Sequence, residues 1–79
     1  MDRAEIVAKI QDVMIDVLDL DELNLTETTT AKDVEGWDSL SHLRLIVAVE
    51  QHFGLKFTTG EIERFKNVGD MVSTVQSKQ

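Results

Sequence analysis

The sequence predicts an all-α fold of four helices, three longer and one short, with a long loop between the first and the second. Three observations predict it. Apolar residues recur at helical spacing near the start of the chain, residues 39–53 contain no glycine or proline, and a capping residue precedes each helical segment. With 79 residues, 42% of them apolar, the chain is expected to form one domain spanning residues 1–79.

The first helix is predicted from about Arg3 to Leu18, and Asp2 with Glu5 forms a capping pair at its start. Its apolar side chains are spaced three and four residues apart and therefore share one face. These are Ile6, Val7, Ile10, Val13, Met14, Val17 and Leu18.

Residues 19–37 mix Asp, Glu, Asn and Thr with scattered apolar side chains that follow neither a helical nor a strand period. So long a connection is uncommon in so small a domain and needs a structural reason. We expect the apolar side chains to pin the loop across the helices and to hold residue 38 in a fixed place. They are Leu20, Leu23, Leu25, Val34 and Trp37.

A second helix is predicted from Ser39 to about Phe53. Residues 45–49 are rich in β-branched side chains and would also suit a buried strand. Length favours the helix, because an unbroken run with Asp38 as N-cap and Gly54 just beyond its end matches the signals of a single helix.

Two helices are predicted after Gly54. Thr58 with Glu61 forms a capping box and opens a short helix that runs to about Phe65, and Asn67 with Asp70 caps a last helix. The core is predicted to include apolar residues from the second helix onward. They are Leu43, Ile46, Val47, Val49, Phe57, Ile62, Phe65, Val68, Val72 and Val75.

The net charge of -7 is concentrated in one part of the chain, because residues 12–38 hold nine acidic side chains against the single base Lys32. Such a field argues against nucleic acid and anionic membranes as partners and favours a basic protein, although an acidic surface that only maintains solubility is an open alternative. The absence of cysteine excludes disulfides and a thiol nucleophile. No apolar stretch is long enough for a signal peptide or a membrane span, so we expect a cytoplasmic protein.

Asp38-Ser39-Leu40 places a serine hydroxyl at the first turn of the predicted second helix. Backbone N–H groups at a helix start can hold an anion, so this is the local chemistry that a phosphodiester attached to serine requires. A purely structural interpretation stays open here, because Asp and Ser are both frequent at helix starts.

The sequence has Gly-Trp-Asp-Ser-Leu at 36–40, where the predicted second helix starts, and Glu-Gln-His-Phe-Gly at 50–54, where it ends, and a short helix is predicted after Thr58. This pattern resembles the acyl carrier proteins, and the resemblance covers essentially the whole chain. It implies a small four-helix bundle with no enzymatic activity. It also implies that Ser39 carries 4'-phosphopantetheine from coenzyme A, attached by a separate phosphopantetheinyl transferase that recognises Asp38, and that the arm holds acyl groups as thioesters.

The resemblance implies two further sets of residues in a monomeric carrier. Acyl-transferring and acyl-modifying enzymes with basic patches would contact the exposed side of the second helix, at Leu40, Ser41, Arg44, Val47 and Glu50. Part of the core would open to shelter an acyl chain. That pocket would involve Leu43, Ile46, Phe57, Ile62 and Phe65, with Lys56, Phe57 and Thr58 near its mouth.

Arg44 departs from the family pattern. Carriers of primary fatty-acid synthesis usually have acidic residues on this side of the helix, whereas Ser41 and Arg44 stand two and five positions after Ser39. A reversed charge at a docking point changes partner choice more than it changes the fold. The sequence therefore indicates a carrier for a specialised lipid or secondary-metabolite pathway, and a solvated arginine without such a role is the competing interpretation.

Two other functions remain open: an aminoacyl or peptidyl carrier, against which Asp38 argues, and an unmodified acidic adaptor that binds a basic partner through residues 12–38. No metal site is predicted, since the acidic loop lacks the glycine and glutamate spacing of a calcium loop. His42 and His52 point in different directions and are interpreted as surface residues. No strand-to-turn nucleophile elbow surrounds Ser39, which argues against a hydrolase triad.

Overall fold

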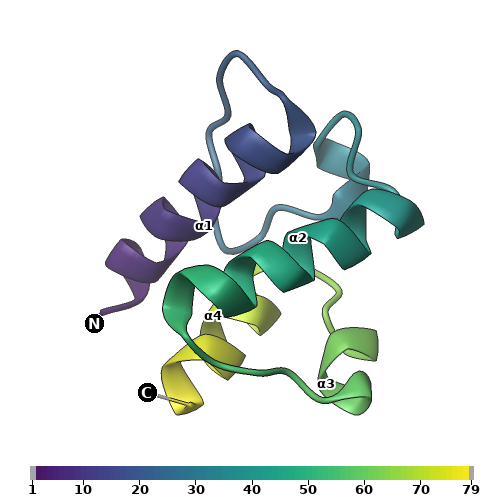
Figure 1. Cartoon of the computed structure of the whole chain (residues 1–79). Coiled ribbons are helices and arrows are strands. Elements are labelled where there is room, and N and C mark those ends of the chain that lie inside the picture. Colours follow the sequence, from purple (N-terminus) through teal and green to yellow (C-terminus); the bar gives the residue numbers. More distant parts are fainter. Residues whose placement is uncertain (1, 79) are drawn as a thin grey trace.

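The computed structural model describes residues 2–78, which form four α-helices and no strand, so the predicted fold class is confirmed (Figure 1). Met1 and Gln79, the ends of the predicted domain, lie outside the described residues. No helix in the described part is both long and apolar enough to cross a membrane. The helices are α1 (Arg3–Leu18), α2 (Ser39–Phe53), α3 (Thr59–Glu63) and α4 (Val68–Ser77).

Every helix begins at the capping residue that the sequence predicts. The side chains of Asp2, Asp38, Thr58 and Asn67 each accept a hydrogen bond from the backbone N–H three residues later. These bonds satisfy donors that a helix start leaves without a partner within the helix. The starts of the helices are therefore set by local chemistry.

The short helix α3 ends at Glu63, before the predicted end near Phe65. Its final turn tightens, because the backbone N–H groups of Arg64 and Phe65 bond to carbonyls three residues back, those of Glu61 and Ile62. Bonds of this spacing form a 3₁₀ turn rather than an α-helix. Phe65 lies beyond the end of α3 but still packs against the core. The apolar pattern in the sequence therefore continued past the true end of the helix.

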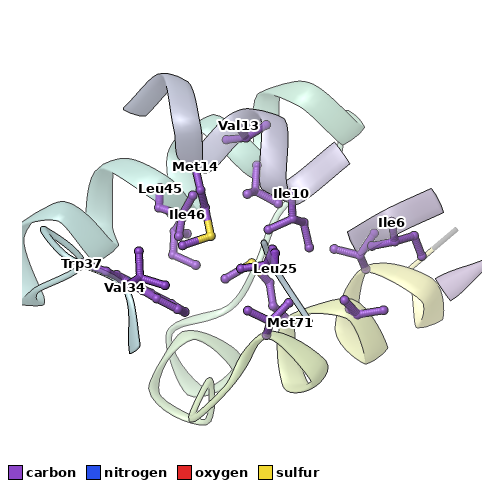
Figure 2. Close-up of a cluster of buried hydrophobic side chains, with 14 of the residues drawn as sticks. Ile6, Ile10, Val13, Met14, Leu25, Val34, Trp37, Leu45, Ile46 and Met71 are labelled. Atoms are coloured by element: carbon purple, nitrogen blue, oxygen red, sulfur yellow. The ribbon is translucent and has the colours of Figure 1, made fainter. Parts of the chain in front are cut away.

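The core lies where α1 packs against α2 and α4. Figure 2 shows side chains of α1, including Ile10 and Met14, directed toward Leu25 of the long loop and Met71 of α4. Ile10, Met14 and Met71 are completely buried. Burial of each such side chain contributes about 1.5–3 kcal/mol relative to exposure.

The predicted core of α2 is wrong at two positions. Leu43 and Val47 are 58% and 51% exposed, whereas Leu45, which the prediction omitted, is completely buried beside Ile46 and Val49. With about 100° of rotation per residue, α2 carries two apolar stripes of helical spacing. Periodicity alone cannot decide which of the two faces the bundle.

The long loop is pinned as predicted. Leu25, Val34 and Trp37 are almost completely buried, and Leu20 and Leu23 pack against the core at its edge. A backbone N–H in the loop, that of Leu25, donates to the side-chain carbonyl of Gln11 in α1 at 2.9 Å. The sequence did not indicate the short 3₁₀ turn at Ala31–Asp33 within this loop.

The loop also joins the first turn of α4. The backbone N–H groups of Val68 and Gly69 donate to the carbonyls of Thr29 and Glu27, at 2.9 and 2.7 Å. A side chain at position 69 would place its Cβ 2.9 Å from the carbonyl oxygen of Glu27, so this close approach requires glycine. Arg3 of α1 forms an ion pair with the Glu27 carboxylate. The long loop is therefore bonded to both the first helix, α1, and the last helix, α4.

Candidate functional site

Ser39 is the first residue of α2, and it is exposed. The residue before it, Asp38, accepts a hydrogen bond from the backbone N–H of Ser41 at 2.9 Å and so caps the helix. That bond holds the pKa of the Asp38 carboxyl below its usual range. At neutral pH an ionised cap and the positive end of the α2 dipole therefore flank the Ser39 hydroxyl.

Because the Asp38 carboxylate caps α2, the stability of the fold should depend on pH in a way that can be measured. A carboxyl whose pKa is lower in the folded than in the unfolded chain stabilises the fold above its ordinary pKa of 3.8. This contribution is lost as the pH falls through the lowered value. We expect the melting temperature of wild type to exceed that of Asp38→Asn, which keeps a neutral cap, at pH 6–7. The difference should shrink toward zero in acid, and an unchanged difference would contradict the assignment.

A surface cavity of about 520 Å³ borders Ser39. Its volume lies within the usual range of small-molecule sites. The cavity lies between the end of the long loop, the first turn of α2 and α3, so segments far apart in the sequence form it. It is lined by Ala31, Trp37, Asp38, Ser39, His42, Ile62, Glu63, Phe65 and Lys66.

The residues predicted to line an acyl pocket separate into three groups. Ile62 and Phe65 line the cavity beside Ser39. Ile46 and Phe57 are buried in the core, where the ring of Phe57 meets that of Phe65 edge to face at 5.2 Å. Leu43 is exposed on the outer side of α2 instead and does not line the cavity beside Ser39.

Sequence reasoning missed the pairing of Trp37 with His42. The indole N–H of Trp37 donates to Nδ1 of His42 at 3.0 Å, and the two rings lie nearly in parallel planes, 25° apart, with their centroids separated by 6.0 Å. Phe65 packs edge-on against the imidazole at 6.4 Å. The interpretation of His42 as a surface residue is therefore wrong, because it is half-buried, whereas His52 is exposed as predicted.

Burial lowers the pKa of His42 from its ordinary value of 6.5, and a backbone contact with Ile62 opposes that shift in part. The imidazole is therefore neutral at pH 7. Since Nδ1 accepts the indole N–H, the ring proton resides on Nε2. The only signal in the sequence was an aromatic residue five positions before a histidine, across a helix start.

The outer side of α2 exposes an apolar stripe. Leu40, Leu43 and Val47 are 67%, 58% and 51% exposed, and Arg44 lies exposed among them. Exposed apolar residues gathered in this way mark interaction surfaces. We call Leu40, Leu43, Arg44 and Val47 the outer face of α2.

Two residues predicted to contact partners have structural contacts. The carboxylate of Glu50 accepts the backbone N–H of Phe57 at 2.7 Å and so holds the loop that follows α2. Ser41 is half-buried, and its backbone N–H bonds to Asp38. The described residues contain no cluster of three His, Cys, Asp or Glu side chains that could bind a metal ion.

Comparison with known proteins gives consistent matches. The family model for the phosphopantetheine attachment site matches residues 8–75. The chain is 34% identical over 76 residues to an acyl carrier protein of Thermotoga maritima, covering 96% of this chain and 94% of that protein. It is 34% identical over 79 residues to one of Lactobacillus acidophilus, covering 100% and 99%. The solution structure of a holo acyl carrier protein from Geobacter metallireducens matches with a TM-score of 0.84 and 42% identity, covering 91% of this chain and 83% of that one.

Proposed function

The chain belongs to the acyl carrier protein family, and from that premise we propose that Ser39 bears its 4'-phosphopantetheine. The observation that carries the proposal is the exposed Ser39 hydroxyl at the start of α2, beside a cavity of ligand size. Of the other serines, Ser41 is half-buried and Ser73 and Ser77 lie on α4. Only Ser39 begins a helix whose positive end can stabilise a phosphate, by roughly 0.3–1 kcal/mol when exposed.

The residues around Ser39 suit the attachment of 4'-phosphopantetheine. Asp38 sets where α2 begins and therefore where the hydroxyl lies, and the pinned loop holds Asp38 itself in place. When attached, the group supplies a thiol, which this cysteine-free chain lacks, for holding acyl groups as thioesters. Acyl carrier proteins are not enzymes, so recognition and presentation are the tasks left to these side chains.

The attachment can be tested on the wild-type chain. Incubation with coenzyme A, magnesium and a broad-specificity phosphopantetheinyl transferase should add one phosphopantetheine mass. Proteolysis and fragmentation should place that mass on Ser39 rather than on Ser41. No mass gain, or a gain on another residue, would refute the proposal.

The family membership also bears on the alternatives. A phosphopantetheine attachment family does not fit an unmodified adaptor, and that alternative is set aside. The matched relatives are named acyl carrier proteins, which supports acyl rather than aminoacyl cargo.

We further propose that the outer face of α2 contacts the partner enzymes and that these belong to a specialised pathway. The outer face of α2, Leu40, Leu43, Arg44 and Val47, contains a single charged side chain, that of Arg44. Arg44 therefore determines the charge of this face. A partner with a basic patch at this point would meet a like charge, whereas one with a carboxylate or an apolar surface would not.

Reversal of this charge should broaden partner choice. We expect Arg44→Glu to lower the KM of a general fatty-acid ketosynthase for the acyl-loaded carrier by about tenfold, because a repulsion of roughly 1.4 kcal/mol is removed. Steady-state acyl transfer measures the effect. Arg64→Glu, an equal charge reversal on an exposed residue just after α3, is the matched control and should leave the KM unchanged. Equally high activity of wild type and Arg44→Glu would contradict the specialised role.

A further inference from the structure

The bond between Trp37 and His42 spans the junction at which the long loop becomes α2. Trp37 is the last loop residue before the cap, and His42 lies in the first turns of the helix. The bond from Nε1 of Trp37 to Nδ1 of His42, at 3.0 Å, therefore encloses Asp38 and Ser39 between its two ends. In the same short segment, the His42 backbone N–H bonds to the Asp38 carbonyl at 2.8 Å.

Packing holds this pair from both sides. Trp37 is only 6% exposed and belongs to the hydrophobic core, so the loop side of the junction cannot move without disturbing that core. On the other side, His42 lies between the Trp37 ring, at an interplanar angle of 25°, and the ring of Phe65, which meets the imidazole edge to face. An indole N–H left without this acceptor would lose a hydrogen bond at a partly buried position.

We propose that His42 is a positioning residue for Ser39: its imidazole accepts the Trp37 indole N–H and so fixes the direction in which the Ser39 hydroxyl is presented to the phosphopantetheinyl transferase. The inference rests on the proposed attachment at Ser39. His42 acts through Trp37 and makes no contact with the transferred group in this role.

The role requires an imidazole without a proton on Nδ1. A protonated imidazole has an N–H at both nitrogens and cannot accept the indole N–H. The charged side chains that line the same cavity are Asp38, Glu63 and Lys66. The two carboxylates favour protonation of His42 and the ammonium group opposes it. Because burial lowers the pKa of His42, the bond is intact at neutral pH and is lost only as the pH falls through that lowered pKa, below the ordinary value of 6.5.

Three substitutions separate positioning from general stability. His42→Asn places an amide oxygen near the position of Nδ1 and cannot be protonated. His42→Leu removes the acceptor, and Trp37→Phe removes the donor while keeping an aromatic ring in the core. Circular dichroism and thermal melting establish which variants remain folded under the assay conditions. Should His42→Leu unfold, Trp37→Phe still tests the bond.

The first measurement is the kcat/KM of transferase loading from pH 5 to 8, expressed relative to His42→Asn so that the pH dependence of the transferase cancels. At pH 7.5 we expect the kcat/KM of wild type to equal that of His42→Asn. The kcat/KM of His42→Leu and of Trp37→Phe, which lack the bond, should be about two- to tenfold lower. Below pH 6.5 wild type should fall toward these variants, while their own ratio to His42→Asn stays constant.

The second measurement does not depend on loading. Trp37 is the single tryptophan of the chain, so the emission reports on the surroundings of this indole alone. Its emission should titrate together with the imidazole NMR signals of His42, and the titration should vanish in His42→Asn. If the emission fails to follow His42, or if a folded variant without the bond loads like wild type, the inference is wrong. If the wild-type chain gains no mass at any pH, the proposed attachment itself fails.

Discussion

Replacement of Ser39 by alanine is expected to abolish phosphopantetheine attachment completely, whereas Ser41→Ala should preserve it. The transferred group needs an oxygen nucleophile, and alanine offers none. The Ser39 side chain is exposed, so its removal leaves the core intact. Ser41 contributes its backbone N–H to the Asp38 cap, and that donor survives the change to alanine.

The comparison is made by mass spectrometry after incubation of each variant with coenzyme A and the transferase. Wild type and Ser41→Ala should each gain a single modification, and Ser39→Ala should gain none. Circular dichroism should give the same helix content for all three, which separates loss of the hydroxyl from loss of fold. Modification of a folded Ser39→Ala would place the attachment elsewhere.

Leu45→Ala should produce the largest loss of stability among single changes in α2, about 2–5 kcal/mol. Leu45 is completely buried, so truncation removes apolar contacts and leaves a cavity. A domain of this size is expected to have a total stability of about 4–12 kcal/mol, so this loss is a large share of the total.

Leu43→Ala is the matched control, because it makes the same chemical change two positions away on a side chain that is 58% exposed. Its effect should stay within about 0.5 kcal/mol. Urea unfolding followed by circular dichroism gives both free energies. Equal losses at the two positions would mean that the assignment of the buried and exposed stripes of α2 is wrong.

Two surfaces meet at Ser39, and we assign a different task of this carrier to each. The outer face of α2 projects apolar side chains and Arg44 toward solvent, whereas the cavity beside Ser39 is formed by the loop end, α2 and α3. Under the proposals above, Arg44 influences which enzymes approach, and the Trp37–His42 pair influences how the serine is presented to the transferase. Changes on one surface should therefore leave the other function intact.

Local chemistry made much of the fold predictable. Caps such as Asp38 with Ser41 and Thr58 with Glu61 join residues three apart, so the sequence alone contains both partners. The same holds for Gly54, whose φ of 67° ends α2 in a left-handed conformation that glycine adopts without strain. The family resemblance followed from equally local motifs, and the family match over residues 8–75 confirmed it.

The sequence by itself determined the helices, their starts, the apolar anchors of the loop and the membership of the family. Only the tertiary structure decided that Leu45 rather than Leu43 enters the core, that His42 accepts the indole N–H of Trp37, and that Glu50 holds the Phe57 backbone. The physical reason is that both apolar stripes of α2 have helical spacing. Which stripe is buried depends on the surface that α1 presents, and this surface meets α2 only after the chain has folded.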